Sequence, residues 1–370
     1  MVTDQPETGR RPTLAVVGVT GAVGKVVLQV LTMRRHLWGD VRLAAGAEDV
    51  GSAVQLGPDE VTVEALSADF FDGVDIAIFD IPPHIAREWV ELAAGRGVVA
   101  IDNSTVFRTD PDVPLVVPEV NPRRVADRPR SIIANPGATV MTMIDVLAVL
   151  HGGWELTDLV VTTFQAASGL GRAGMNRLHD ELDVVHGDRD LGTRPGDVRR
   201  LVEHELGRES PFPAPLALNV VPFVGHHVGE GWTSEEVKVR DETRKILDLP
   251  QLTVAATCVR VPVVSSHSVT VHATFARKIK VEEARRALVE APAVVVLDDP
   301  DEPEFPTPND VVGADPRFVG RIRQSPDSPT TLDLFISGDN LRKGAALNMV
   351  QTAELVAADL AGAPATDRPE

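Results

Sequence analysis

Three glycines at regular spacing form the first segment of the chain that could do chemistry. Gly18, Gly21 and Gly24 lie between a short apolar run at residues 14–17 and a segment of helical period at residues 26–33. At such a strand-to-helix turn, backbone N–H groups and the positive helix end can hold a dinucleotide pyrophosphate. The GxxGxxG spacing differs from the commoner GxGxxG, and a tight turn without a ligand is the alternative. The predicted contacts of NAD or NADP are Gly18, Thr20, Gly21, Ala22, Val23 and Gly24.

The residues after the expected second strand indicate which dinucleotide would fit. Residues 43–49 read LAAGAED, a small and acidic stretch. Glu48 or Asp49 could accept a hydrogen bond from a ribose 2′-hydroxyl, but both would repel a 2′-phosphate. NAD and NADP both stay open, although this stretch offers no 2′-phosphate site.

Charge and cysteine content exclude several classes of function. A formal net charge of −18 over 370 residues argues against nucleic acid or an anionic membrane as a partner, since either needs a basic face. A local cluster of cations could still hold a small acidic substrate. The single cysteine, Cys258, excludes an intramolecular disulfide and a thiolate metal cluster, and no metal site is predicted. The N-terminus lacks the apolar segment of a signal peptide, and no apolar run reaches the ~18 residues of a membrane span, so a cytoplasmic protein is expected.

The first third of the chain has the pattern of an α/β fold with a doubly wound sheet. Apolar runs at residues 14–17, 74–79 and 97–101 predict buried strands, and residues 87–94 predict a helix between the last two. Strands that alternate with helices imply parallel βαβ units. We therefore expect a Rossmann-like dinucleotide-binding domain over residues 1–136.

The pattern changes near residue 136. Residues 159–164, 252–264 and 269–275 predict longer strands of a mixed or antiparallel sheet, and the polar segment 178–206 predicts a helical excursion. The expected parts are an α+β catalytic and dimerisation domain over residues 137–335, a C-terminal helix at 336–362 that returns to the first domain, and a disordered tail at 363–370.

Four stretches, in chain order, resemble segments of the aspartate-semialdehyde dehydrogenase family. They are IDNSTVFRTDPDVPLVVPEVN (101–121), FQAASGLGRAG (164–174), RVPVVSSHSVTV (260–271) and DNLRKGAALNMVQTAEL (339–355). The glycine turn matches as well, so the resemblance spans most of the chain. It implies a homodimer formed through the second domain. It also implies an oxidation in which a cysteine thiolate attacks an aldehyde, hydride passes to NADP, and phosphate releases the acyl group.

The resemblance implies roles for individual residues. His267 matches the acid–base histidine, Gln165 the glutamine that orients the intermediate, and Arg260 the arginine that grips the substrate carboxylate. These residue types suit their roles, because an arginine fork fits a carboxylate and a histidine transfers protons near neutral pH. Taken singly, a structural histidine and a strand-edge charge are the alternatives.

Further matches concern the amine and phosphate contacts. Glu235 and Lys238 match the pair that contacts the substrate amine and the phosphate, and Arg108 matches the second phosphate ligand, with Asn135 beside it. Two cations suit a phosphate dianion. Asn340 matches a cofactor contact. A solvated helix face is the alternative for Glu235 and Lys238 taken alone.

The sequence departs from the family at the nucleophile. Residues 135–139 read NPGAT, which places Ala138 at the position of the family's cysteine. A methyl group cannot form a thiohemiacetal or an acyl-enzyme. Cys258 shares a strand face with Arg260 and could approach the site, but we interpret it as structural. Thr139 is a poor nucleophile without a base in contact, and we expect it to hydrogen-bond at the helix N-terminus.

Two more departures affect the cofactor. The family's Arg-Ser pair for the 2′-phosphate is missing from residues 44–51, and its Ser-Ala-Gly-Gly loop is replaced by DIPPH at residues 80–84. Two prolines remove two backbone donors and fix the loop, so the dinucleotide contact there must differ.

Three hypotheses follow. The first is a repurposed enzyme that acts non-covalently on an aspartate-like, dicarboxylic or acyl-phosphate ligand, with His267 as general acid or base in an elimination, hydration or condensation. The second is a non-catalytic binding or partner subunit. The third is an NAD(P)-dependent oxidoreductase that reduces an aldehyde or semialdehyde directly, without acyl transfer.

Overall fold

The computed structural model of the chain describes residues 10–362. The tail expected at residues 363–370 lies outside them. The described residues form two compact units, which we call unit 1 (residues 10–136 and 345–362) and unit 2 (residues 137–344). Within this range, no helix is long and apolar enough to span a bilayer.

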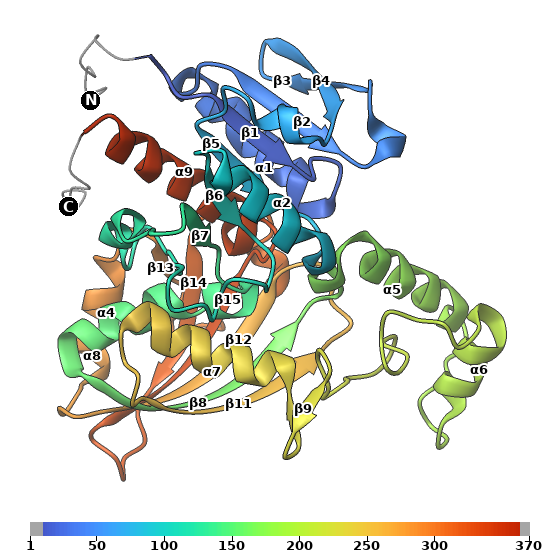
Figure 1. The fold of residues 1–370 in the computed structure, drawn as a ribbon. Helices are drawn as coiled ribbons and strands as arrows, with labels where there is room; N and C mark the ends of the chain where they lie inside the picture. The colour runs from blue at the N-terminus through green and yellow to red at the C-terminus, as the bar shows by residue number, and fades with distance from the viewer. Residues whose placement is uncertain (1–9, 363–370) are drawn as a thin grey trace. The chain divides into compact units, whose positions relative to one another are not determined.

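A seven-stranded sheet forms the centre of unit 1, in the order β3-β4-β2-β1-β5-β6-β7 (Figure 1). The strands are β1 (Leu14–Val17), β2 (Val41–Ala45), β3 (Ala53–Leu56), β4 (Asp59–Ala65), β5 (Ile76–Phe79), β6 (Val99–Asp102) and β7 (Ile132–Ala134). The predicted parallel α/β sheet is confirmed. Only β3 and β4 pair antiparallel, because a two-residue turn joins them and parallel strands need a longer crossover.

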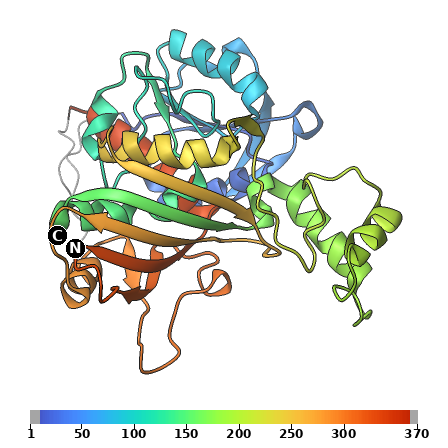
Figure 2. The same ribbon diagram turned by 90° about the horizontal axis from the view of Figure 1, so that it is seen from below.

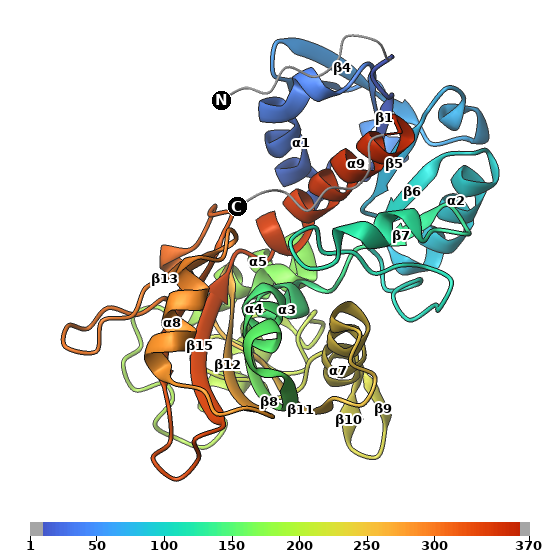
Figure 3. The ribbon, with the colours of Figure 1, turned by 90° about the vertical axis from the view of Figure 1, so that its left-hand side faces the viewer.

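The helices of unit 1 are α1 (Ala22–Arg34), α2 (Pro83–Gly95) and α9 (Leu347–Leu360). As predicted, the C-terminal helix returns to the first domain, and α9 lies beside α1 (Figures 1 and 3). Apolar side chains of α9, β1 and β5 share one core. The C-terminal helix was expected from residue 336, but β15 (Thr331–Gly338) occupies the first of these residues, and a π-helical segment, Arg342–Ala346, precedes α9.

A mixed six-stranded sheet forms unit 2, in the order β11-β8-β12-β15-β14-β13. The strands are β8 (Leu156–Gln165), β11 (Thr253–Arg260), β12 (His267–Phe275), β13 (Val294–Val296), β14 (Arg317–Arg323) and β15 (Thr331–Gly338), and a hairpin adds β9 (His227–Gly229) and β10 (Trp232–Thr233). The strand predicted over residues 252–264 ends at Arg260. Pro262 lacks the N–H group that a continued ladder would use, and the chain turns there.

The helices of unit 2 are α3 (Ala138–Met141), α4 (Ile144–Trp154), α5 (Gly171–Val185), α6 (Asp197–Leu206), α7 (Ser234–Leu247) and α8 (Val281–Val289). Helices α4 and α8 pack on the sheet, and α7 packs on β11. Figure 2 shows α5 and α6 extending away from the sheet, which is the predicted helical excursion. In both units, short 3-10 helices connect other elements; they are Arg35–Leu37, Ala47–Asp49, Ala68–Phe71, Pro122–Ala126, Ala167–Leu170 and Pro308–Asp310.

Candidate active site

One edge of the unit 2 sheet gathers several predicted site residues. Gln165 ends β8 and Arg260 ends β11, and the two are register partners in a parallel pairing. His267 begins β12, which runs antiparallel to β8, so it lies at the same edge. It pairs with Gly338, the last residue of β15, and Asn340 follows two residues later. The sheet topology alone therefore brings an amide, a guanidinium and an imidazole to one place.

Arg260 is held by the backbone. Its Nη1 donates to the Ala166 carbonyl at 2.7 Å, and its side chain is buried. A Cβ atom at Gly169 would lie 2.6 Å from Nη1, so this glycine leaves room for the guanidinium. Burial lowers the pKa of Arg260, an effect that the charge of Glu235 opposes, but an arginine stays cationic at neutral pH. Among the described residues, Ala166 is the hydrogen-bond partner of the Arg260 guanidinium, so the other N–H groups of the guanidinium remain for an acidic ligand.

His267 is neutral and has a defined tautomer. Its Nδ1 accepts a hydrogen bond from the Ala166 N–H at 3.1 Å, so the ring proton resides on Nε2. Burial and the charge of Arg260 lower the pKa of His267 to about 3, and Glu235 offsets this only in part. At neutral pH the ring therefore presents an N–H donor, which can polarise a carbonyl, rather than a cationic acid.

Glu235 connects three neighbours. Its Oε1 accepts from Thr139 Oγ1 at 2.8 Å and from Gln165 Nε2 at 3.4 Å, and its Oε2 pairs with Lys238 Nζ at 2.9 Å. Thr139 thus donates to a carboxylate on α7, whereas we expected a hydrogen bond at its own helix terminus. Gly137 is the N-cap of α3 and makes no side-chain cap. The carboxylate fixes the groups around the start of α3.

Ala138 is the first residue of α3 and is partly exposed. The turn before it is held by Glu242, whose buried Oε2 accepts the Gly137 N–H at 2.6 Å. Sequence analysis did not identify Glu242. A usable signal was present, because Glu235, Lys238 and Glu242 follow the i, i+3, i+7 spacing of one helix face.

Cys258 is fully buried in β11. Burial raises the pKa of its thiol to about 12, and the charges of Glu235 and Glu236 act in the same direction, against a hydrogen bond with Thr163. At neutral pH the side chain is a protonated thiol without solvent access. This supports its interpretation as a structural cysteine.

Asn340 forms hydrogen bonds with two loops, one containing Ser168 and the other containing Ser266. Its Oδ1 accepts from Ser168 Oγ at 3.0 Å and from the Ser266 N–H at 2.9 Å. Ser266 has a positive φ of 75°, which this hydrogen bond helps to maintain beside His267. The oxygen of Asn340 is therefore engaged in the loops, and its amide nitrogen is the atom that would serve a predicted cofactor contact.

The glycine turn of unit 1 requires glycine for steric reasons. Gly18 has a φ of 99°, and a Cβ there would lie 2.1 Å from the Asp80 carbonyl oxygen. A Cβ at Gly24 would lie 2.3 Å from the Gly18 carbonyl oxygen. Helix α1 starts at Ala22, after an N-cap at Gly21 that makes no side-chain hydrogen bond. This strand, glycine turn and helix have the arrangement that suits a dinucleotide.

Glu48 lies at the carboxyl end of β2. Its Oε1 is 2.6 Å from the position that a Cβ of Gly46 would occupy, so the carboxylate folds back over the strand end. A carboxylate there fits ribose hydroxyls and opposes a 2′-phosphate.

Arg108 and Asn135 belong to unit 1, where both contact Asn103. Arg108 Nη2 donates to the Asn103 carbonyl at 2.7 Å. Asn135 Nδ2 donates to Asn103 Oδ1 at 2.9 Å, and its Oδ1 accepts from Asn348 at 2.8 Å. These bonds fix both predicted phosphate contacts to the ends of β6 and β7.

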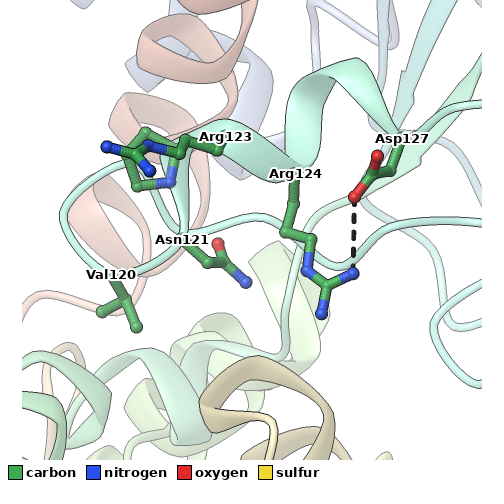
Figure 4. Close-up of a pocket in the computed structure, with 6 residues that line it drawn as sticks. Val120, Asn121, Arg123, Arg124 and Asp127 are labelled. Carbon is green, nitrogen blue, oxygen red and sulfur yellow. Dashed lines mark hydrogen bonds and ion pairs between the residues drawn. The ribbon is translucent and has the colours of Figure 1, made fainter. Parts of the chain in front are cut away.

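A separate cavity in unit 1 lies around the 3-10 turn Pro122–Ala126 (Figure 4). Its volume is about 390 Å³, and an ion pair joins Arg124 and Asp127 at 3.4 Å on its wall. It contains none of the predicted site residues. Its lining is Val120, Asn121, Pro122, Arg123, Arg124 and Asp127.

Comparisons with known proteins agree with the two units. Residues 13–128 match the semialdehyde dehydrogenase NAD binding domain, and residues 147–343 match the semialdehyde dehydrogenase dimerisation domain. The aspartate-semialdehyde dehydrogenase of Streptomyces akiyoshiensis is 44% identical over 351 residues, which cover 94% of this chain and 99% of that protein. The chain belongs to the aspartate-semialdehyde dehydrogenase family.

Other members support the same assignment. The aspartate-semialdehyde dehydrogenase of Mycolicibacterium smegmatis is 41% identical over 359 residues, covering 94% of this chain and 99% of that protein. The crystal structure of aspartate semialdehyde dehydrogenase II complexed with ASA from Vibrio cholerae has a TM-score of 0.86 at 33% identity, and covers 95% of this chain and 99% of that one. The family resemblance stated from the sequence is confirmed, together with the α/β fold and its second, dimerisation domain.

Proposed function

We propose that this member of the family binds a small aspartate-like, dicarboxylic or acyl-phosphate ligand in unit 2 and acts on it without a covalent intermediate. The observation that carries the proposal is the methyl group of Ala138 at the first position of α3. A phosphorylating oxidation needs a nucleophile that holds the acyl group, and a methyl group cannot do so.

The other candidate nucleophiles are unsuited to replace the missing sulfur. Cys258 is the only cysteine of the chain, and its thiol is buried and protonated. Thr139 does have a carboxylate in contact, but that carboxylate is already paired with Lys238 and accepts a hydrogen bond from Gln165. We therefore assign Thr139 a positioning role.

The side chains around Ala138 favour an acidic, amine-bearing ligand. The Arg260 fork suits a carboxylate, Glu235 suits an ammonium group, and Lys238 suits a second anionic group. The Vibrio cholerae relative was crystallised with ASA, in keeping with such a ligand. In our proposal His267 donates its Nε2 proton as a hydrogen bond to a ligand carbonyl, and Gln165 orients the same group.

An activity assay of the natural protein and of Ala138→Cys tests the proposal. Aspartate semialdehyde, phosphate and either NAD or NADP are supplied, and reduced dinucleotide is followed by absorbance. We expect no phosphate-dependent turnover from the natural protein and measurable turnover from Ala138→Cys. Ala138→Ser is the matched control, because it adds a hydroxyl of similar size without a thiolate and should stay inactive. Phosphate-dependent turnover by the natural protein would refute the proposal.

A second candidate is a direct NAD(P)-dependent reduction of an aldehyde or semialdehyde. The glycine turn and the match to the NAD binding domain favour this reduction, since both are features of a site for a dinucleotide that carries hydride. Oxidation of NADH or NADPH by the natural protein in the absence of phosphate would identify this activity. We also propose that the chain acts as a homodimer, with NAD or NADP as the dinucleotide.

A further inference from the structure

We propose that the carboxylate of Asp80 occupies the phosphate position of the glycine turn in unit 1 and opposes the binding of a dinucleotide diphosphate. Asp80 directly follows β5, in the loop where the chain departs from the family sequence. The inference concerns unit 1 alone and does not depend on the reaction proposed for unit 2.

Asp80 lies against the first turn of α1. Its carboxylate accepts the backbone N–H of Gly24, and its Oδ2 is 3.4 Å from the position that a Cβ of Gly21 would take. Its Oδ1 accepts from Nδ2 of Asn103, the residue that follows the neighbouring strand β6, at 2.8 Å, and this bond fixes the side chain. An acidic group from the chain itself is thus seated at the N-terminal end of α1.

Such a carboxylate takes up one of the backbone donors that a diphosphate would use. The first N–H groups of a helix have no intrahelical partner, and the helix dipole favours one negative charge beside them. Asp80 meets this demand in the free protein. A diphosphate that approaches must displace the carboxylate or tolerate a like charge within a few ångströms, and either requirement weakens binding.

The charges around Asp80 make this opposition dependent on pH. Burial raises the pKa of Asp80, the hydrogen bonds from Asn103 and Gly24 counteract this, and the negative charge of Asp102 raises it further. The positive charge of Arg108 acts on Asp102, where it favours the ionised carboxylate. Asp80 therefore gains a proton at a higher pH than an exposed aspartate would. Since the protonated form carries no charge, dinucleotide affinity should increase as the pH falls through its pKa.

Isothermal titration of the full chain with NAD tests the inference directly. Asp80→Asn removes the charge and keeps the shape and the acceptor oxygen, and we expect it to lower the Kd at pH 7.5 by at least ten-fold. Asp72→Asn is the control for net charge, because Asp72 is an exposed residue of the same unit that pairs with Arg96. The control should leave the Kd unchanged.

A pH series separates the charge of Asp80 from other titrations. The Kd of the natural protein should fall as the pH is lowered from 7.5 towards 4, while that of Asp80→Asn should stay nearly constant. Equal Kd values for the natural protein and Asp80→Asn, or absence of binding by both, would overturn the inference. Circular dichroism shows whether Asp80→Asn is folded, and Asp80→Ser provides a second neutral variant if it is not.

Discussion

At the scale of single residues, the chemistry that we propose for unit 2 depends on where a cysteine thiol is present and where it is absent. The first position of α3 offers a site that is partly exposed and bordered by polar groups, but it carries Ala138. The one sulfhydryl of the chain lies on β11 with no solvent access. Placement, rather than the number of cysteines, decides whether a thiolate can form.

Thiol labelling tests this difference in environment. Native wild-type protein should not react with a thiol reagent such as DTNB at pH 8, because Cys258 is buried and its pKa is raised to about 12. Ala138→Cys should release one equivalent rapidly, since a cysteine at a helix N-terminus has a lowered pKa. Unfolded wild-type protein should also release one equivalent, which is the internal control. Rapid labelling of the native wild-type protein would contradict the assignment.

His267 makes stability dependent on pH. The unfolded chain binds a proton at this residue below about pH 6.5, whereas the folded chain does so only near pH 3. The folded state therefore loses up to about 1.4 kcal/mol per pH unit as the pH falls from about 6.5 towards 3. Urea denaturation at pH 7 and pH 5 should show a loss of about 2 kcal/mol from this group, which is absent in His267→Gln. The control His227→Gln, on an exposed hairpin, should retain the full loss.

The proposed role of His267 as a site residue rests on its sequence match, but its protonation state could not be predicted from the sequence. That state depends on a hydrogen bond from Ala166, which lies 101 positions away, and on Arg260 packed beside it. Asp80 is a similar case. Its contacts with Gly24 and Asn103 come from two other segments of the chain, so only the three-dimensional fold reveals them.

At the scale of elements, α7 carries two residues that we propose to contact the ligand and a third, Glu242, that supports the turn at residues 137–139. Glu235 and Lys238 lie near the start of the helix, and Glu242, about two turns after Glu235, reaches the Gly137 N–H. The helix itself is well determined by its sequence, because Thr233 and Glu236 form a capping box. The motif thus predicts where α7 starts, and its spacing predicts which side chains face the same way.

Removal of the Glu242 carboxylate should destabilise the protein. Glu242→Leu leaves the partly buried Gly137 N–H without this partner, and we expect a loss of about 1–3 kcal/mol in the free energy of unfolding. Glu242→Gln keeps an acceptor and should lose less. Asp241→Asn, whose side chain is 33% exposed on the same helix, is the control and should have little effect. Urea denaturation measures all three, and equal stability of wild type and Glu242→Leu would contradict the assignment.

At the scale of the whole molecule, sequence patterns predicted the two sheets better than the edges of the elements. Apolar runs in β1, β5 and β6 predicted the parallel sheet because fully buried strands contain little else. The β3–β4 hairpin was not predicted, since its strands are largely exposed and have few apolar residues. The end of β11 was misjudged because residues 261–264 are apolar and yet leave the ladder.

We expect the full chain to be a dimer, as the match to the dimerisation domain favours. Size-exclusion chromatography with light scattering should give twice the 39.7 kDa of the chain. Val160 on β8 is 51% exposed, whereas its neighbours Leu159 and Val161 are buried, so it points to the opposite sheet face. Val160→Asp should shift the mass towards the monomer if this face is the interface. Glu155→Gln, a neutral replacement at the exposed residue just before β8, should not.

The absence of a side chain at Gly169 permits the observed orientation of the Arg260 guanidinium. With 2.6 Å between a hypothetical methyl and the guanidinium, Gly169→Ala would force the fork to rotate while its charge stays intact. Such a variant changes the orientation of the guanidinium but not its charge. A ligand attracted only by the positive potential would still bind, whereas a ligand held by two parallel hydrogen bonds would lose its affinity. The ligand affinity of Gly169→Ala would thus show whether Arg260 recognises the geometry of a carboxylate or only its negative charge.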